Sequence, residues 1–366
     1  MEGVAWSSGL SGGLSLDLRT ALISQLLETF MKILAYILKR LAISIPTLFG
    51  LIVIVFFLSR VIPANPIMVL VGMSATPEQI KEMEKRYGFD QPVSVQFVTY
   101  LKKLSHGDLG YSLRSTRPVM DELKRRLPPT VELIGAALAI SILLGIPAGI
   151  IAALRRNTWL DHCLRASTIS GVAIPGFWLG IMLQLILGLD LGILPLGGQM
   201  SGAEPPLVTR FMVIDSLLAL DGKLLVDALY HLVLPAFTLS MPGVATIARF
   251  TRSGFLGVMQ TDYIAYSRSM GLPKHLIVYK YAFRNAIVAT VTQIGLIMGH
   301  LLAGTVVIEY IYFWPGIGAY MIDVILHFDY DGILGSTLLI GVAFVMINIA
   351  VDVVQAFIDP RIIDTL

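Results

Sequence analysis

The chain has 366 residues, of which 55% are hydrophobic and only 14% are charged. Its mean hydropathy of +0.77 is well above that of soluble domains, which excludes an ordinary water-soluble enzyme or binding domain. The formal net charge of +2 says little about partners, and we expect no nucleic-acid partner. The composition therefore indicates an integral membrane protein, with the lipid bilayer as its solvent.

The first 30 residues differ from the rest. They are rich in glycine and serine, then weakly amphipathic, and they lack the basic start and apolar centre of a signal peptide. Met31 is followed by Lys32 and by an apolar stretch ten residues later, as at a natural start. We therefore expect residues 1–30 to be a disordered extension, or to precede the true start at Met31.

Six uncharged runs are long enough to cross a bilayer, whose hydrocarbon core of about 30 Å needs roughly 20 apolar residues per helix. Lipid cannot satisfy backbone polar groups, and the runs are continuous rather than alternating, so each is expected to be a helix. The sequence predicts an all-α, polytopic membrane protein with six transmembrane helices. The runs are 41–59, 133–154, 166–189, 228–248, 285–308 and 332–351.

Basic residues gather before the first run, between the second and third, and between the fourth and fifth. Because lysine and arginine in short loops stay on the cytoplasmic side, these connections and both termini are predicted to be cytoplasmic. The connection 309–331 carries four acids and no lysine or arginine, so it is predicted to be external. Cys163, the single cysteine, falls in a predicted cytoplasmic turn and is interpreted as a plain small residue.

The long segment after the first run is expected to be structured. Thr76 reads as an N-cap before a proline and a capping-box glutamine, and Gly88 marks a helix end, so a helix is predicted over 77–87. Further helices are predicted over 92–104 and 118–127. Together they would form a small external cap.

The chain contains no recognisable energy source of its own. It lacks a G-x-x-x-x-G-K-[ST] phosphate loop, a metal-binding cluster and a serine-nucleophile motif, so no cofactor or catalytic residue is expected. Only His231 and His300 are ionisable inside the runs, whereas ion-coupled transporters usually carry intramembrane relay groups. A lone histidine there more often bonds one helix to another. An ion-coupled secondary transporter stays an alternative, but the sequence favours energy supplied by a partner.

The cytoplasmic connection 249–285 is expected to form a helix-turn-helix elbow. Gly271 is placed as a helix C-cap, and Pro273 can open a second helix. An apolar surface flanked by basic residues is predicted from Tyr263, Ile264, Tyr266 and Met270. Two readings remain open: a knob that fits a groove on a partner protein, or an interfacial helix on anionic lipid.

The elbow resembles the coupling loop of ABC importer permeases, and specifically the dipeptide/oligopeptide type. That pattern is Glu-Ala-Ala, three residues, then Gly, and here the positions are Ala265, Tyr266, Ser267 and Gly271, so the first two depart from it. Further stretches are similar to the family in the same order. They are Tyr36-Ile37-Leu38-Lys39-Arg40, Arg60-Val61-Ile62-Pro63, Gly107-Asp108-Leu109-Gly110-Tyr111-Ser112, Arg126-Leu127-Pro128, Trp314-Pro315-Gly316-Ile317-Gly318 and Asp359-Pro360-Arg361.

The resemblance implies a type I ABC importer permease in the cell (inner) membrane. It implies a homologous second permease, two cytoplasmic ABC ATPase subunits that hydrolyse ATP, and an extracytoplasmic solute-binding protein. Ala265, Tyr266, Ser267 and Gly271 would form the ATPase-coupling surface. The cargo would be peptides or similar small solutes, with oligosaccharides or nickel complexes as alternatives in the same family.

The expected division of the chain follows the runs. Residues 31–60 hold the first transmembrane helix, 61–130 the external helical cap, and 131–362 a five-helix permease core with its coupling loop at 249–285. The connection 190–227 is glycine- and proline-rich, so we expect it to lack regular structure.

Polar residues in the fifth run are candidates for the translocation path. Gln293 and His300 lie seven residues apart, about two turns, so they share one helix face. Glu309 follows at the predicted outer mouth and is a candidate for an external gate. Prolines and glycines inside the runs, such as Pro175 and Gly176, predict kinks that a moving bundle can use, although these residues are also simply common in membrane helices.

Overall fold

A computed structural model describes residues 10–61, 76–202 and 204–358 and is mostly helical. The chain divides into two compact units, one of Met1–Thr47 with Ile349–Leu366 and the other of Leu48–Asn348. The expected features at residues 1–9, 62–75 and 359–366, including the Asp359-Pro360-Arg361 stretch, lie outside the described residues.

The smaller unit holds parts of two helices, α1 (Leu10–Val61) and α14 (Tyr330–Ile358). Asp352 accepts a hydrogen bond from Tyr36 Oη at 3.0 Å and forms an ion pair with Arg40 Nη2 at 3.1 Å. Arg40 Nε in turn donates to Tyr36 Oη at 2.7 Å. Helix α1 is continuous from Leu10, so positions 10–30 are helical, where the sequence had suggested a disordered extension.

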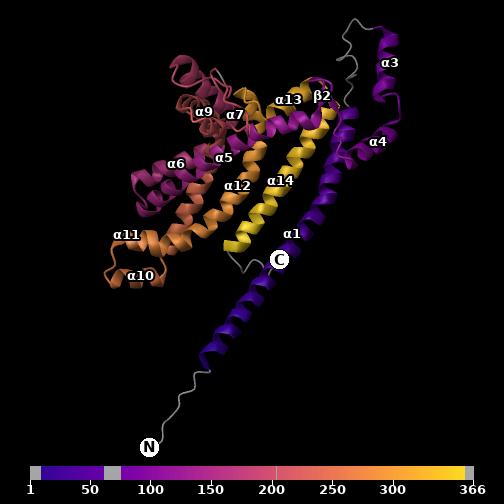
Figure 1. The fold of residues 1–366 in the computed structure, drawn as a ribbon. Helices are drawn as coiled ribbons and strands as arrows, with labels where there is room; N and C mark the ends of the chain where they lie inside the picture. The colour runs from indigo at the N-terminus through magenta and orange to yellow at the C-terminus, as the bar shows by residue number, and fades with distance from the viewer. Residues whose placement is uncertain (1–9, 62–75, 203, 359–366) are drawn as a thin grey trace, which may run out of the picture. The chain divides into compact units, whose positions relative to one another are not determined.

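The larger unit is built on α5 (Val119–Leu154), α9 (Gly222–Val258) and α12 (Phe283–Ile311), which pack side by side (Figure 1). Small residues let these helices approach closely, as is common between membrane helices. A Cβ on Gly149 of α5 would lie 2.6 Å from the Ala248 carbonyl oxygen, and one on Gly254 of α9 would lie 2.5 Å from that of Ala286. The glycines therefore set the spacing of the bundle.

Among the described residues, five helices are long and apolar enough to cross a membrane, and a bent helix pair makes the predicted sixth span if it is counted as one. Helix α6 (Trp159–Ala173) is followed by α7 (Gly176–Leu183) and a π-helical segment, η1 (Gln184–Asp190), and the two halves are bent by 104°. The break has a local cause, because Pro175 lacks an N–H and keeps Ile174 extended. The expected helix over 166–189 is therefore interrupted near its start.

Two expected features near the start of α5 and α9 differ in the structure. The helix expected over 118–127 is not separate, because it forms the first turns of α5 and continues through Pro128 and Pro129. The connection 190–227, expected to lack regular structure, contains α8 (Met212–Leu218). Its first backbone N–H groups, those of Met212 and Val213, donate to the Glu132 carboxylate at 3.2 and 2.8 Å, a tertiary cap that local sequence does not reveal.

Over residues 10–61, 76–202 and 204–358 the all-α prediction holds except for one short hairpin. Strands β1 (Tyr111–Ser112) and β2 (Arg117–Pro118) pair antiparallel, with Tyr111 opposite Pro118. The hairpin contacts the start of α14, where Asp331 accepts from Tyr111 N at 3.2 Å and Asp329 accepts from Ser112 Oγ. Gly110 has no room for a side chain, since a Cβ there would meet the Asp331 carboxylate.

Helices α3 (Pro77–Tyr87) and α4 (Val93–Ser105) confirm the helices expected over 77–87 and 92–104. The capping box is present as predicted: Gln79 N donates to Thr76 Oγ1 at 3.3 Å, and Thr76 N donates to Gln79 Oε1 at 3.0 Å. Gly88 ends α3 with a φ of +73°, in the left-handed region that favours glycine. Local signals therefore sufficed for these elements.

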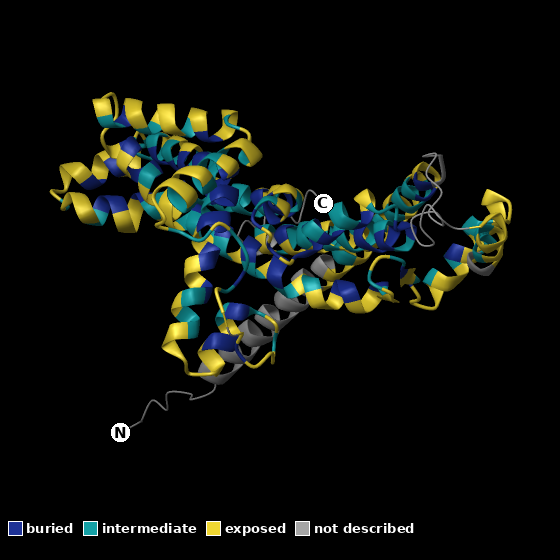
Figure 2. Cartoon of the chain, turned by 90° about the horizontal axis from the view of Figure 1, so that it is seen from above, coloured by how far each residue is buried: buried dark blue, intermediate teal, exposed yellow. Residues whose placement is uncertain are grey.

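Large apolar side chains face outward along the spans. Leu143 on α5 and Ile169 on α6 are both 70% exposed. Figure 2 shows the outward sides of the helices as largely exposed and the buried residues gathered between them. Such surfaces suit lipid rather than water, in agreement with the membrane class.

Candidate functional site

The predicted elbow is present at one end of α9 and α12, where Figure 1 shows it away from α13 (Ile317–Leu326). Helix α10 (Asp262–Ser269) is followed by a turn and then by α11 (Lys274–Leu276), which runs through η2 (Ile277–Ala282) into α12. Gly271 adopts a φ of +74°, and Leu272 N donates to Ser267 O at 3.3 Å, which closes the helix end. The helix-turn-helix prediction is confirmed.

The elbow has an inner and an outer face. Ile264 is fully buried against Phe255 and Ile277, so the prediction that it belongs to the exposed apolar surface is wrong. Ser267 is also buried, and its Oγ donates to Tyr263 O within α10 at 2.7 Å. Ile264 therefore anchors the elbow to the bundle, whereas the Ser267 hydroxyl is bonded within α10 and neither side chain is presented to a partner.

The outer face carries the other predicted residues. Tyr266 is 66% exposed and Met270 is 63% exposed, with Ala265 also exposed and Gly271 at the open turn. A Cβ on Gly271 would meet no atom within 4 Å. Of the four coupling candidates, three therefore face outward and Ser267 does not.

An ion pair behind the elbow was not found from the sequence. Arg252 near the end of α9 donates to both carboxylate oxygens of Asp161, at 2.8 and 2.9 Å. Asp161 is fully buried and also accepts from Asn157 N at 3.0 Å. The available signal was that Asp161 is the one acid in the otherwise basic connection 155–165.

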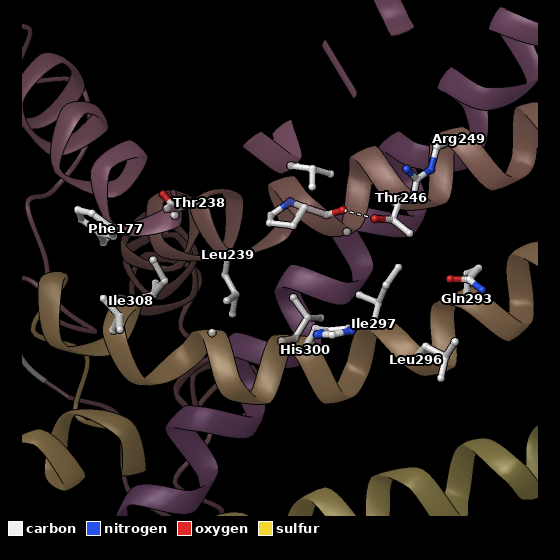
Figure 3. Close-up of a pocket in the computed structure, with 17 residues that line it drawn as sticks. Phe177, Thr238, Leu239, Thr246, Arg249, Gln293, Leu296, Ile297, His300 and Ile308 are labelled. Carbon is white, nitrogen blue, oxygen red and sulfur yellow. Dashed lines mark hydrogen bonds between the residues drawn. The ribbon is translucent and has the colours of Figure 1, made fainter. Parts of the chain in front are cut away.

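A cavity of about 550 Å³ lies between α7, α9 and α12 (Figure 3). Its lining is mainly apolar, and both predicted path residues, Gln293 and His300, contribute to it. In Figure 3 they project from α12 toward α9, which carries Thr246 and Arg249. The structure thus brings together Gln293 and His300 on one cavity wall, whereas Glu309 is not part of the lining.

Glu309 is instead fully buried in the last turn of α12, next to the start of α13. Its carboxylate accepts hydrogen bonds from Thr130 Oγ1 at 2.7 Å, Gly318 N at 2.6 Å and Ala319 N at 3.1 Å. A carboxylate is favourable there, because the first N–H groups of a helix lack partners of their own. Glu309 therefore caps α13, and a role in a gate stays a prediction.

The same network explains the Trp314–Gly318 stretch noted in the sequence. Trp314 Nε1 donates to Pro129 O at 2.9 Å, and Ile317 N donates to Thr130 Oγ1 at 2.8 Å, which ties the turn to α5. Gly316 and Gly318 give the carboxylate room, since a Cβ on either would lie within 3 Å of Glu309. The Trp314–Gly318 stretch therefore has a structural role, which is to connect α12 and α13 to α5.

Long apolar helices, one broken span and a protruding elbow define a polytopic membrane protein of the permease class. Residues 145–364 match the family described as binding-protein-dependent transport system inner membrane component, and residues 33–134 match its N-terminal domain. The chain belongs to this family, and it has the type I ABC importer permease fold.

Individual relatives are similar over most of their length. The chain is 41% identical over 315 residues to a probable D,D-dipeptide transport system permease protein, DdpB, of Escherichia coli K12, covering 86% of this chain and 93% of that protein. It is 37% identical to the dipeptide transport system permease protein DppB of Alkalihalophilus pseudofirmus, covering 90% and 99%. It is 35% identical to the glutathione transport system permease protein GsiC of Escherichia coli O6:H1, again covering 90% and 99%.

Proposed function

We propose that this chain forms half of the translocation path of an ABC importer for short peptides. The observation that carries the proposal is the similarity, over 86% or more of the chain, to permeases named for dipeptides. Oligosaccharides and nickel complexes are the alternatives within the family. An uptake assay in proteoliposomes that compares a labelled dipeptide, a labelled oligosaccharide and a labelled nickel complex separates the three. ATP-dependent uptake of the oligosaccharide alone or of the nickel complex alone would reject the peptide assignment.

The elbow is proposed to receive a cytoplasmic ATPase subunit on the face formed by Ala265, Tyr266, Met270 and Gly271. The exposed apolar side chains on this face support the proposal, because such a knob can fill a groove on a partner. Ser267 supports the surface from within. Its buried hydroxyl bonds within α10, so it fixes the helix that carries Tyr266.

The remaining partners complete the proposal. A homologous second permease would supply the other half of the path, and a solute-binding protein would deliver cargo at the α13 end. Two ATPase subunits would hydrolyse ATP, so this chain is not itself an enzyme. We propose that the elbow and both termini lie on the cytoplasmic side of the cell membrane, because basic residues flank the elbow and such residues stay on that side.

The path is proposed to pass the cavity that Gln293 and His300 line. Cysteine substitutions at these positions are expected to react with a membrane-permeant thiol reagent in at least one state of the transport cycle. Protection of both positions in the resting complex and in the ATP-bound complex would remove them from the path.

The coupling assignment is tested by Gly271→Trp. The added ring would project into open space on the docking face. We expect the complex to assemble in detergent while transport no longer follows ATP hydrolysis. Gly88→Trp is the matched control, because Gly88 has nearly the same φ, +73°, and equal room but lies at the end of α3. Normal transport by Gly271→Trp would contradict the assignment.

A further inference from the structure

A second cavity of about 550 Å³ lies between the start of α5, the connection before α8 and the turn before α13. It is therefore at the opposite end of α9 and α12 from the elbow. Four guanidinium groups and two carboxylates line it, so its formal charge is positive. The charged residues are Arg117, Arg125, Arg126, Arg210, Glu122 and Glu204.

Two of the arginines are held by a buried acid. Glu122 pairs with Arg126 at 3.3 Å and lies 3.9 Å from Arg117. The Arg126 guanidinium also stacks 4.8 Å from the centre of the Tyr320 ring. These groups hold one another in place with one positive charge left over, and Arg125 and Arg210 with Glu204 add a second.

Arg210 is held by its backbone. The buried Asp215 accepts hydrogen bonds from Thr209 N and Arg210 N, both at 2.8 Å, and from Val208 N at 3.2 Å. Burial alone would raise the pKa of Asp215, but these bonds and the Thr209 hydroxyl hold the pKa below its usual value, so the carboxylate stays charged. The loop keeps Arg210 at a φ of +66°, which a non-glycine residue rarely adopts.

Gln199 supplies an unused donor. The residue is only 8% exposed, and its Nε2 has no hydrogen-bond partner within the described part of the chain. The backbone beside it is held by a hydrogen bond from Gly198 N to Tyr312 O at 2.8 Å. A buried amide donor without an acceptor is unfavourable, and a ligand oxygen would remove that penalty.

The side chains of Arg125 and Arg210 are exposed and form no ion pair among residues 76–202 and 204–358. An arginine matches a carboxylate with two parallel hydrogen bonds. The cavity has the volume of a small-molecule site. The Gln199 amide lies in its concave wall, which a small solute can enter and the flat surface of another protein cannot.

From these observations we infer that this cavity binds the terminal carboxylate of a small peptide through Arg125, Arg210 and Gln199, with Glu204 available to its ammonium group. The permease would thus carry a cargo site of its own at the α13 end. The choice of a peptide rests on the proposed function, whereas the choice of a carboxylate rests on the cavity.

The inference is tested by equilibrium binding of labelled L-alanyl-L-alanine to the full chain in detergent. The C-terminal amide of the same dipeptide is expected to compete about tenfold less well, as the loss of a charge-assisted hydrogen bond implies. Arg125→Gln and Arg210→Gln should each weaken binding of the acid by about tenfold and reduce the difference between acid and amide.

Two further variants separate a ligand role from a structural one. Gln199→Leu should weaken binding while leaving the thermal midpoint unchanged or higher, because it removes an unpartnered buried donor. Arg114→Gln is the matched control: this arginine lies in the turn of the β1–β2 hairpin, outside the cavity, and should bind the dipeptide as the unmodified chain does.

Equal binding of acid and amide, or arginine variants that bind normally, would overturn the inference. Absence of saturable binding would also overturn it. If the arginine variants then weakened attachment of the solute-binding protein, the carboxylate would belong to that protein. The binding measurement needs no ATPase, so the two proposals can fail separately. Dipeptide binding without ATP-coupled transport would reject the proposed function and support the site. ATP-coupled peptide transport without binding to this chain would support the proposed function and reject the site.

Discussion

The two ends of the α9–α12 bundle are held together in different ways. At the elbow end the contacts are largely apolar, with Ile264 and Phe255 at the centre and one ion pair, Arg252–Asp161, behind them. At the α13 end, a buried carboxylate, a hydroxyl and an indole N–H connect three helices through directed hydrogen bonds.

The difference matches the work proposed for each end. Apolar contacts tolerate small sliding movements, so an elbow seated on them can shift when a partner moves. Directed bonds around Glu309 lose their geometry on any such shift. We therefore expect the α13 end to stay rigid and the elbow end to move during transport. Substitutions at the α13 end should mainly lower stability, and those on the outer face of the elbow should mainly weaken attachment of the ATPase.

The largest effect is expected at the rigid end. Glu309→Ala leaves three donors without their acceptor in a buried site, and we expect it to lower the apparent free energy of unfolding by roughly 4 kcal/mol. The measurement is denaturant unfolding in mixed micelles. Glu309→Gln keeps one acceptor oxygen and should lose about half as much. A loss below about 1 kcal/mol for the alanine variant would show that the cap is not the main joint.

A smaller effect is expected behind the elbow. Arg252→Ala leaves the buried Asp161 carboxylate with only its backbone donor, Asn157 N, and should cost about 2 kcal/mol. The double variant with Asp161→Asn removes the unpaired charge and should recover part of that loss. Additive losses in the double variant would mean that the two side chains do not act as a pair.

The elbow turn should respond weakly to a small change. Gly271→Ala places a Cβ at a φ of +74° and should cost about 1 kcal/mol, although no atom blocks the side chain. Gly257→Ala is the contrasting control, because Gly257 has equal room but helical backbone within α9, where alanine should stabilise by about 0.5 kcal/mol. The same sign for both variants would argue against the left-handed turn.

The smallest effect on stability belongs to the outer face. Tyr266→Ala removes an exposed side chain and should change the free energy of unfolding by less than about 0.5 kcal/mol. Co-purification of the ATPase subunits with the tagged chain should nevertheless fall several-fold. Retained co-purification would favour the other reading of the elbow, a helix that rests on lipid.

The sequence was sufficient wherever a signal is local. The capping box at Thr76, the αL cap at Gly271 and the apolar runs each depend on neighbours within a few residues, and the structure contains all three. It was insufficient where partners are distant. Thr130 and Glu309 are separated by 179 positions, and Asp161 and Arg252 by 91, so neither pairing has a spacing to detect.

The candidate site followed the same division. The elbow could be located and its turn predicted, but helical spacing alone did not reveal which face packs inward, so Ile264 was placed on the wrong side. Gln293 and His300 were grouped by their seven-residue spacing and do line one cavity, because that spacing is a property of one helix. Their role in a translocation path stays a prediction. Glu309 was singled out from the sequence, but its burial was not predicted, because that burial depends on the glycines of the following turn.

The 104° bend at Pro175 also has a consequence for the surrounding lipid. Each half holds 15 residues or fewer, about 22 Å of helix at 1.5 Å per residue, which is less than the hydrocarbon thickness. The hydrophobic length that α6 and α7 present to the lipid is therefore shorter than that of the straight spans. The bilayer is expected to thin beside them. A change in lipid chain length should therefore affect the protein first on the side where α6 and α7 lie.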